Sequence, residues 1–172
     1  MPVFIERPDG LPPVNGFSHV VTASGTMVFI SGQVPLGPDG TLAGADVSAQ
    51  AEQVFRNLQG ALQAAGVSWA HVVKLTYYLT DIADLPAVRN VRDRYLPADR
   101  LPASSLVQVV ALVNPAFRLE IDAIAVREDM EAQPVSCCFS TPGRSSLARL
   151  PGKRGAICPS LAGHRLDPAA HA

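Results

Sequence analysis

The most informative hydrophobic pattern lies between residues 102 and 126, where it predicts two strands. The first, 103–113, is apolar at almost every position, which is typical of a strand covered on both faces. A short turn at Asn114 and Pro115 separates it from the second strand, 118–126, so the two strands are predicted to form a hairpin. Along the second strand, the residues of one face are all apolar: Leu119, Ile121, Ala123 and Ala125.

The opposite face of the 118–126 strand carries Glu120, a carboxylate near the middle of the predicted sheet. A buried Glu is uncommon without a partner or a purpose, because desolvation penalises the charged form. Two interpretations are open at this point. Glu120 is either half exposed or paired with an arginine, or it is a functional carboxylate.

Two short strands are predicted before the first helix, at 17–23 and 26–31. Both are rich in β-branched and aromatic residues, and the Ser24-Gly25 gap between them is a hairpin signal. Ser31 and Gly32 end the second of these strands. A glycine at a strand end permits a bulge or a close approach of another group to the backbone.

Two helices follow from the pattern of caps and apolar spacing. The first begins after Asp46, a favourable N-cap, and ends at Gly66, which suits the left-handed conformation after a helix. A second, shorter helix is predicted after Asp84, with Pro86 in its first turn. The apolar face of the first helix recurs at spacings of three and four: Val47, Ala51, Val54, Leu58, Leu62 and Ala65.

The predicted order is β-β-α-β-α-β-β, with a strand at 71–80 between the helices and room for another short strand near Thr41. Residues 1–16, rich in Pro and Gly, are expected to be extended. This order indicates an α+β fold in which both helices cover one face of a sheet. The 103–113 strand, however, is apolar on both faces. Other copies of the chain are the expected cover for the second face, so we predict a homo-oligomer.

Composition agrees with surface hidden between subunits and argues against nucleic acid as a partner. Apolar residues make up 48% of the chain and charged residues 17%, below the typical quarter. The net charge is −1 and the sequence pI is about 6.4. The chain has no run of 18 apolar residues that would predict a membrane span. The N-terminus lacks the basic and then apolar pattern of a secretion signal, so a cytoplasmic location is expected.

The chain divides into a predicted domain, residues 1–130, and a tail, residues 131–172. The domain has a net charge of −4 and the tail +3. The tail is rich in Pro and Gly without sustained periodicity, so we expect it to be disordered. It contains all three cysteines, Cys137, Cys138 and Cys158, at spacings that do not fit a zinc site. We therefore expect idle thiols and no metal or cofactor.

Six sequence stretches occur in an order and spacing typical of one protein family. They span about residues 15–127 and read GFSHVV, FISGQVPLGPDG, QAEQVFRNLQGALQAAG, VVKLTYYLTD, PASSLVQV and LEIDAIAV. In these stretches the chain resembles the Rid proteins, also called the YjgF or RidA family and often labelled endoribonuclease L-PSP. The tail matches nothing in this family.

The resemblance implies a fold, an assembly and a reaction. The implied fold is chorismate-mutase-like (YjgF-type), a mixed sheet with two helices on one face, assembled as a homotrimer with ligand pockets between subunits. RidA-type members hydrolyse reactive imines and enamines to 2-oxo acids and ammonia. In them a glutamate holds the attacking water, and Glu120 stands at that position. The implied substrate-binding residues are Phe17, Ser31, Gly32, Arg89, Ser104 and Leu106.

The chain departs from the family at the residue that clamps the substrate carboxylate. The family reads Pro-Ala-Arg-Ser where this chain reads Pro102-Ala103-Ser104-Ser105, so Ser104 replaces the arginine. A hydroxyl cannot supply the charged, bidentate fork of a guanidinium. Phe17 also replaces a tyrosine of the family and therefore lacks its hydroxyl.

Arg89 stands where RidA-type members have an asparagine that lines the pocket. One hypothesis is that Arg89 projects into the cleft and replaces the lost positive charge from the helix side. The alternative is that Arg89, with Arg92 and Arg94, forms a solvated basic helix face paired with Asp93 and Asp99. A further acid, Asp122, shares a face with Glu120 and is expected to form a structural or interface salt bridge.

Three functions follow from these residues. The first is an imine or enamine hydrolase that uses Glu120. The second is a trimer that binds a metabolite without converting it, which the missing arginine favours. The third, ribonuclease activity, is suggested only by the family label, because the acidic domain lacks the basic surface expected for RNA binding.

Overall fold

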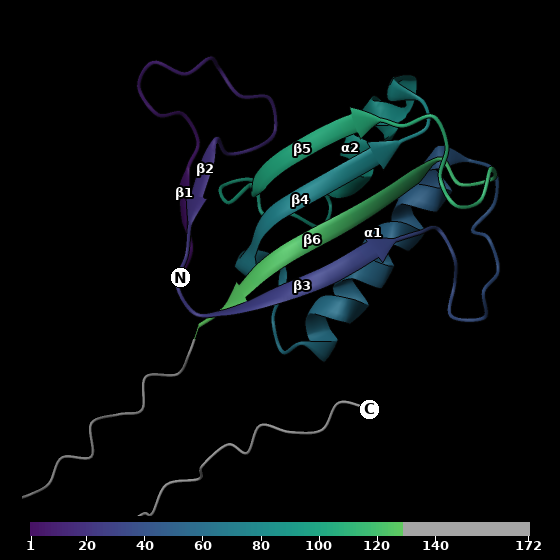
Figure 1. Cartoon of the computed structure of the whole chain (residues 1–172), viewed down its shortest axis with the longest axis horizontal. Coiled ribbons are helices and arrows are strands. Elements are labelled where there is room, and N and C mark those ends of the chain that lie inside the picture. Colours follow the sequence, from purple (N-terminus) through teal and green to yellow (C-terminus); the bar gives the residue numbers. More distant parts are fainter. Residues whose placement is uncertain (129–172) are drawn as a thin grey trace, which may run out of the picture. The chain divides into compact units, whose positions relative to one another are not determined.

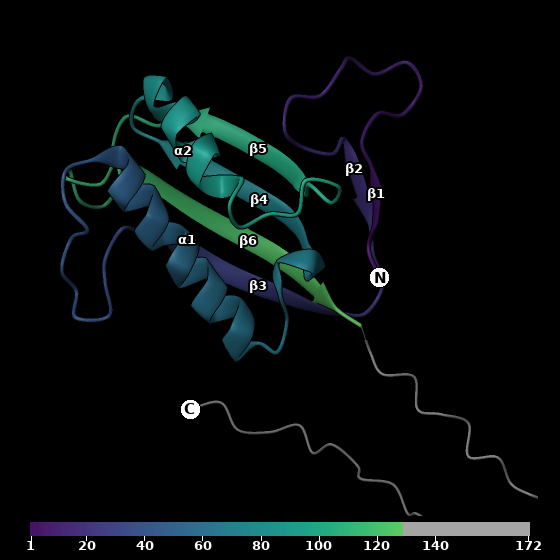
Figure 2. The same cartoon turned by 180° about the vertical axis from the view of Figure 1, so that it is seen from behind.

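The chain folds into a mixed four-stranded sheet with both helices on one face. A computed structural model describes residues 1–128. The main sheet has the order β3-β6-β4-β5, and β1 and β2 form a separate two-stranded sheet (Figures 1 and 2). The elements are β1 (Val3–Ile5), β2 (Val20–Thr22), β3 (Thr26–Gln33), α1 (Val47–Ala64), β4 (Val72–Leu79), α2 (Leu85–Arg92), β5 (Ala103–Gln108) and β6 (Leu119–Arg127), with 3-10 turns at Trp69–His71 and Ile82–Asp84.

The caps of α1 lie where the sequence predicts them. The Asp46 carboxylate accepts a hydrogen bond from the Ala49 N–H at 2.9 Å, and Gly66, with φ of +71°, follows the last turn. The apolar face of α1 packs on β3 and β6, and α2 packs beside α1 on the same side of the sheet (Figure 2). The predicted α+β fold with both helices on one face is therefore confirmed.

The predicted hairpin between the strands at 103–113 and 118–126 is wrong. β5 pairs with β4 in parallel, because α2 carries the chain across the helix face of the sheet before β5 begins. β6 is antiparallel to both β3 and β4 and lies between them. The strand also ends at Gln108, and beyond it the apolar Val110 and Val113 are fully or largely exposed.

The predicted hairpin between the strands at 17–23 and 26–31 is also wrong. β2 pairs with β1, so part of the N-terminal segment that we expected to be merely extended is a strand. β3 pairs with β6 instead. At the bend between β2 and β3, Gly25 has φ of +134°, and a Cβ there would lie 2.2 Å from the Arg127 carbonyl oxygen. The short strand considered near Thr41 is a single bridge between Leu36 and Leu42.

Asp84 occupies the predicted N-cap position of α2, but its side chain does not cap the helix. Its carboxylate instead accepts two hydrogen bonds from the Arg118 guanidinium, at 2.6 and 2.7 Å. Asp81 caps the preceding 3-10 turn through the Ala83 N–H. The Asp84–Arg118 pair thus ties the start of α2 to the start of β6.

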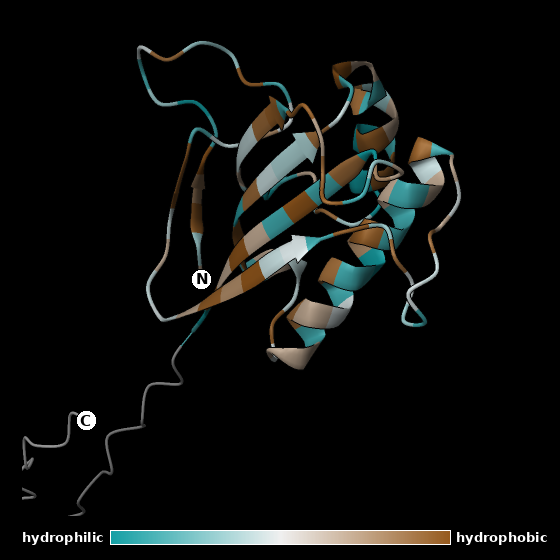
Figure 3. Ribbon diagram, turned by 45° about the vertical axis from the view of Figure 1, so that its right-hand side comes forward, coloured by the Kyte–Doolittle hydropathy of each residue, from teal (hydrophilic) through white to brown (hydrophobic). Residues whose placement is uncertain are grey.

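The face of the sheet away from the helices carries exposed apolar side chains. Phe29 is 72% exposed, Met27 53% and Val107 45%. Figure 3 shows a largely apolar run along β3 and apolar and polar bands that alternate along the first part of β6. Polar side chains such as Glu120 and Asp122 share this face, so the expected apolar face without helix cover is present only in part among the described residues. No helix within residues 1–128 has the length and hydropathy needed to cross a bilayer.

Gln50 is a fully buried polar residue that joins α1 to the loop before β6. Its amide group donates to the carbonyl oxygens of Gly44 at 2.8 Å and Ala116 at 2.9 Å, and its carbonyl oxygen accepts from the Arg118 N–H. The Gln50 side chain is fully buried, so these three hydrogen bonds are the ones that satisfy its own polar atoms away from water. Gln50 therefore stabilises the point from which β6 enters the sheet.

We expect Gln50→Leu to lower the free energy of unfolding by about 1–3 kcal/mol, because it removes three hydrogen bonds that join α1 to the loops around it. Urea unfolding followed by circular dichroism measures the change. Gln59→Leu is the matched control, since Gln59 lies on the same helix but is exposed. Equal unfolding midpoints for the two variants would contradict this role of Gln50.

Candidate functional site

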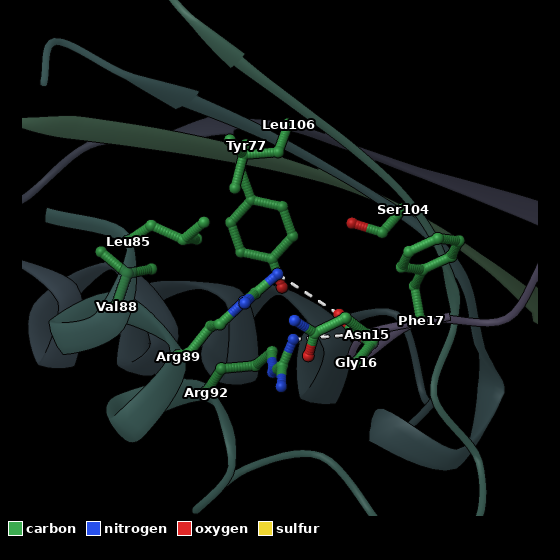
Figure 4. Close-up of a pocket in the computed structure, with 10 residues that line it drawn as sticks. All are labelled: Asn15, Gly16, Phe17, Tyr77, Leu85, Val88, Arg89, Arg92, Ser104 and Leu106. Atoms are coloured by element: carbon green, nitrogen blue, oxygen red, sulfur yellow. Dashed lines mark hydrogen bonds between the residues drawn. The ribbon is translucent and has the colours of Figure 1, made fainter. Parts of the chain in front are cut away.

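A small pocket of about 130 Å³ opens between α2, the edge of the sheet and the segment before β2 (Figure 4). α2 and β4 form its base, and β5 and the 15–17 segment form its rim. The lining residues are Asn15, Gly16, Phe17, Tyr77, Leu85, Val88, Arg89, Arg92, Ser104 and Leu106. Ser104 and Phe17 lie on one side of the pocket, and Arg89 reaches in from the other (Figure 4).

The alternation of β4 and β5 explains why these side chains meet. Leu106 pairs with Tyr77 across the two strands, and Ser104 pairs with Leu75. Tyr77 and Leu75 belong to the core on the helix side. Ser104 and Leu106 therefore also face the helix side, where α2 leaves the edge strand partly open.

Arg92 is held firmly by its neighbours. Its guanidinium forms an ion pair with Asp93 at 2.7 Å and donates to the Gly16 carbonyl oxygen at 2.9 Å, and its side chain is only 10% exposed. Gly16 has φ of +82°, and a Cβ there would lie 2.8 Å from the Arg92 Nη1 atom. Arg92 thus fixes the segment that places Phe17 at the pocket.

Arg89 has a different environment from Arg92. Its Nη2 atom donates to the Asn15 carbonyl oxygen at 3.3 Å, and within residues 1–128 no carboxylate pairs with it. The alternative expected from the sequence is a solvated basic helix face paired with Asp93 and Asp99. In the structure, Arg92 pairs with Asp93, but Arg94 pairs with Glu52.

Tyr77 adds a buried hydroxyl at the base of the pocket. Burial raises the pKa of Tyr77 well above its usual value, while the positive charge of Arg92 acts in the opposite direction. The phenol therefore stays protonated and remains a hydrogen-bond donor across the physiological pH range.

Glu120 lies on the other face of the sheet. It pairs across β4 with Tyr78, which points away from the helices, whereas the adjacent Tyr77 points into the core. Glu120 is half buried and forms no hydrogen bond or ion pair with any other described residue. This agrees with the half-exposed interpretation and excludes an arginine partner within residues 1–128.

Gly32 makes room for the Glu120 carboxylate. A bulge interrupts the β3–β6 pairing between Ile30 and Gln33. A Cβ at Gly32 would lie 1.8 Å from the Glu120 Oε1 atom, so any other residue would displace the carboxylate. The sequence allowed a bulge or a close approach at this glycine. The structure has both, and the group that approaches Gly32 is the Glu120 carboxylate.

Asp122 and Tyr78 form a neighbouring pair on the same face. The Tyr78 hydroxyl donates to the Asp122 Oδ2 atom at 3.1 Å, and this hydrogen bond, together with the charge of Asp122, raises the pKa of Tyr78. Asp122 forms no ion pair within the described residues, so its interface salt bridge stays a prediction.

The predicted site residues thus fall into two groups. Phe17, Arg89, Ser104 and Leu106 meet in the pocket. Gly32 and Glu120 lie together on the open face, and the nearby Ser31 is exposed. Sequence reasoning missed Tyr77 and Arg92, because strand alternation identified Tyr77 only as a core residue and Arg92 only as part of a charged helix face.

The two groups offer different chemistry. The pocket presents the guanidinium groups of Arg89 and Arg92, two hydroxyl groups and an apolar wall, which suit a small anion with an apolar part. Glu120 offers a carboxylate that can hold a water molecule and accept its proton. Among the described residues, no three His, Cys, Asp or Glu side chains gather in a way that could hold a metal ion.

Comparison with known proteins identifies the relatives of this chain. The family model described as endoribonuclease L-PSP matches residues 8–127. Protein DfrA of Myxococcus xanthus is 45% identical over 104 residues, 60% of this chain and 78% of DfrA. The 2-iminobutanoate/2-iminopropanoate deaminase of Salmonella typhimurium is 36% identical over 105 residues, 60% of this chain and 81% of that enzyme.

Solved structures give the same result. A Rid family protein from Yersinia pestis, YyfB, is 34% identical with a TM-score of 0.66, and the match covers 73% of this chain and 98% of YyfB. Escherichia coli TdcF with bound serine is 33% identical with a TM-score of 0.56, over 72% of this chain and 94% of TdcF. Since the family model spans well over half of the sequence, this chain belongs to the endoribonuclease L-PSP family, whose members are also called Rid proteins.

Proposed function

We propose that this protein hydrolyses imines or enamines at a site shared between subunits of a homotrimer. The observation that carries the proposal is the Glu120 carboxylate, which lies half buried on the uncovered face, unpaired among the described residues and accommodated by Gly32. A carboxylate without a structural partner, placed where an added Cβ is excluded, suits a group that must contact a substrate or a water.

A shared site follows from the arrangement of the two groups of residues. The pocket opens on the helix side at the β5 edge, whereas Glu120 lies on the opposite face. One subunit therefore does not bring them together. The side chains of Phe29 and Met27 on the open face are exposed, so contact with another copy of the chain would remove their apolar surface from water. A neighbour that places its pocket edge against this face would complete the site, and a closed ring of three copies repeats this contact.

The reaction requires one water and no redox partner. Glu120 would accept a proton from the water as its oxygen bonds to the imine carbon, while the C=N electron pair moves to nitrogen. Glu120 would then pass this proton to nitrogen, which gives a carbinolamine. As the C–N bond breaks, the carbinolamine hydroxyl proton moves to the leaving nitrogen and the C=O bond forms, so the products are ammonia and a carbonyl compound. The chain itself supplies every group that this sequence uses.

The relatives support this reaction class. The Salmonella protein is named a 2-iminobutanoate/2-iminopropanoate deaminase, and the E. coli relative TdcF is named a reactive intermediate deaminase. The TdcF structure contains bound serine, a small ligand with a carboxylate. Ligands of that size suit the pocket described here.

A second candidate is a trimer that binds a metabolite without converting it. Ser104 favours this function, because it lines the pocket at the position where the resemblance expects the carboxylate clamp. Stabilisation by a ligand against heat, with no product formed, would distinguish this function from hydrolysis.

Glu120→Gln is expected to lower kcat by roughly 10²–10⁴-fold with little change in KM, because an amide of the same shape cannot accept a proton. Ammonia release from freshly generated 2-iminobutanoate measures the change. Asp122→Asn, a similar change on the same face of β6, is the control and should retain most of the activity. Full activity in Glu120→Gln would remove the catalytic role of this residue.

Gly32→Ala is expected to lower kcat by about 10²-fold, since the added Cβ forces the Glu120 carboxylate out of position. The matched control is Gly60→Ala on α1, where a Cβ meets no atom within 4 Å. The same ammonia assay compares the two variants. If both keep wild-type activity, the position of the Glu120 carboxylate is not needed for turnover.

Complementation between inactive variants tests whether the site is shared. Ser104→Trp fills the pocket, and Glu120→Gln removes the carboxylate, so each variant alone should be inactive. Equal amounts unfolded and refolded together should recover about a quarter of wild-type activity, because that share of sites joins two intact halves from different subunits.

Light scattering should show that this mixture has about three times the 18.2 kDa mass of one chain. Trimers without recovered activity would show that the pocket and Glu120 do not act together as one site between subunits. Particles of single-chain mass would rule out the assembly.

A further inference from the structure

Two arginines of α2 reach the same pocket, but only one has its charge compensated. Arg92 is paired with Asp93 and bound to the Gly16 carbonyl oxygen. Arg89 has a single hydrogen bond, at 3.3 Å, to the Asn15 carbonyl oxygen and no carboxylate partner within residues 1–128. A guanidinium has five N–H donors, so most of those on Arg89 are free to bind another group.

The surroundings of Arg89 favour an anion over a neutral ligand. The Ser104 hydroxyl faces it across the pocket, and Tyr77 supplies a phenol at the base (Figure 4). Neither of these groups carries a negative charge, and burial keeps the Tyr77 phenol protonated. A ligand carboxylate would therefore meet donors from three sides.

The other lining residues are apolar, and they indicate what kind of group the rest of the ligand carries. Leu85, Val88, Leu106 and the Phe17 ring make an apolar wall. The pocket is small, about 130 Å³, which limits the apolar part to a short chain. The matching chemistry is a small monocarboxylate with a short apolar side chain.

We propose that Arg89 is the residue that selects anionic substrates in this protein, with the Ser104 hydroxyl as a neutral second donor. The inference rests on the pocket being the substrate-binding half of the proposed hydrolase site. It assigns the positive charge of the site to helix α2, whereas the edge strand β5 contributes only a hydroxyl.

A pair of probes that differ only in charge tests this assignment. Calorimetry would measure the binding of 2-oxobutanoate and of its neutral amide, 2-oxobutanamide, to the full-length protein. The wild-type protein should prefer the acid, because hydrogen bonds to charged groups are stronger than neutral ones. Arg89→Gln keeps a donor for the Asn15 carbonyl oxygen but removes the charge, so it should lose roughly ten- to a hundredfold of that preference.

Arg94→Gln is the control, since Arg94 lies outside the pocket and pairs with Glu52. It should keep the wild-type preference for the acid. An unchanged preference in Arg89→Gln would overturn the proposal, and so would a wild-type protein that does not distinguish the two probes. The second result needs no variant and therefore holds even if Arg89→Gln does not fold.

This binding experiment is independent of turnover. If hydrolysis fails, Glu120→Gln and the wild-type protein will release ammonia alike, while the preference for the acid will still depend on Arg89. If the anion assignment fails, the preference will not follow Arg89, whatever the rate of ammonia release.

Discussion

The structure depends on the position of β6 between β3 and β4. A central strand is hydrogen-bonded on both sides, so its alternation determines which residues reach each face. Leu119 and Ile121 fall on the helix face and are fully buried, whereas Glu120 between them falls on the other. A slip of one residue would bury the carboxylate in the core and expose both apolar side chains. The energy that fixes the core therefore also fixes the candidate catalytic group.

Local features of the fold could be predicted from the sequence, but pairing between distant strands could not. The cap at Asp46, the glycine after α1 and the alternation of β6 involve residues close in sequence, and each is confirmed. Both predicted hairpins are wrong, because sequence neighbours with a short connection do not have to pair. β6 lies between two strands that precede it in the sequence. The packing of both helices on one face of the sheet favours this strand order.

In the candidate site, too, residue positions could be predicted from the sequence, whereas contacts between distant segments could not. The resemblance identified Glu120, Gly32 and Ser104 by position, but only the register of the strands shows that they lie on opposite faces. Arg92 was placed on a solvated helix face, and it is instead buried against Gly16 and Asp93. The burial of Arg92 depends on Gly16, a glycine with positive φ that is distant in the sequence. The spacing of residues within α2 could not predict this contact.

The two unusual residues of the chain can be understood together, because they line one pocket. Ser104 lacks the charge that the resemblance expects on β5, and Arg89 places a charge on α2 across the same space. The pocket thus contains a cation, which is attached to the helix and not to the edge strand. In the proposed site between subunits, an anion held by α2 would lie differently relative to the neighbour's Glu120 than an anion held by β5. Since attack on a C=N carbon requires close alignment of water and substrate, the position of Arg89 would decide which imines this protein converts.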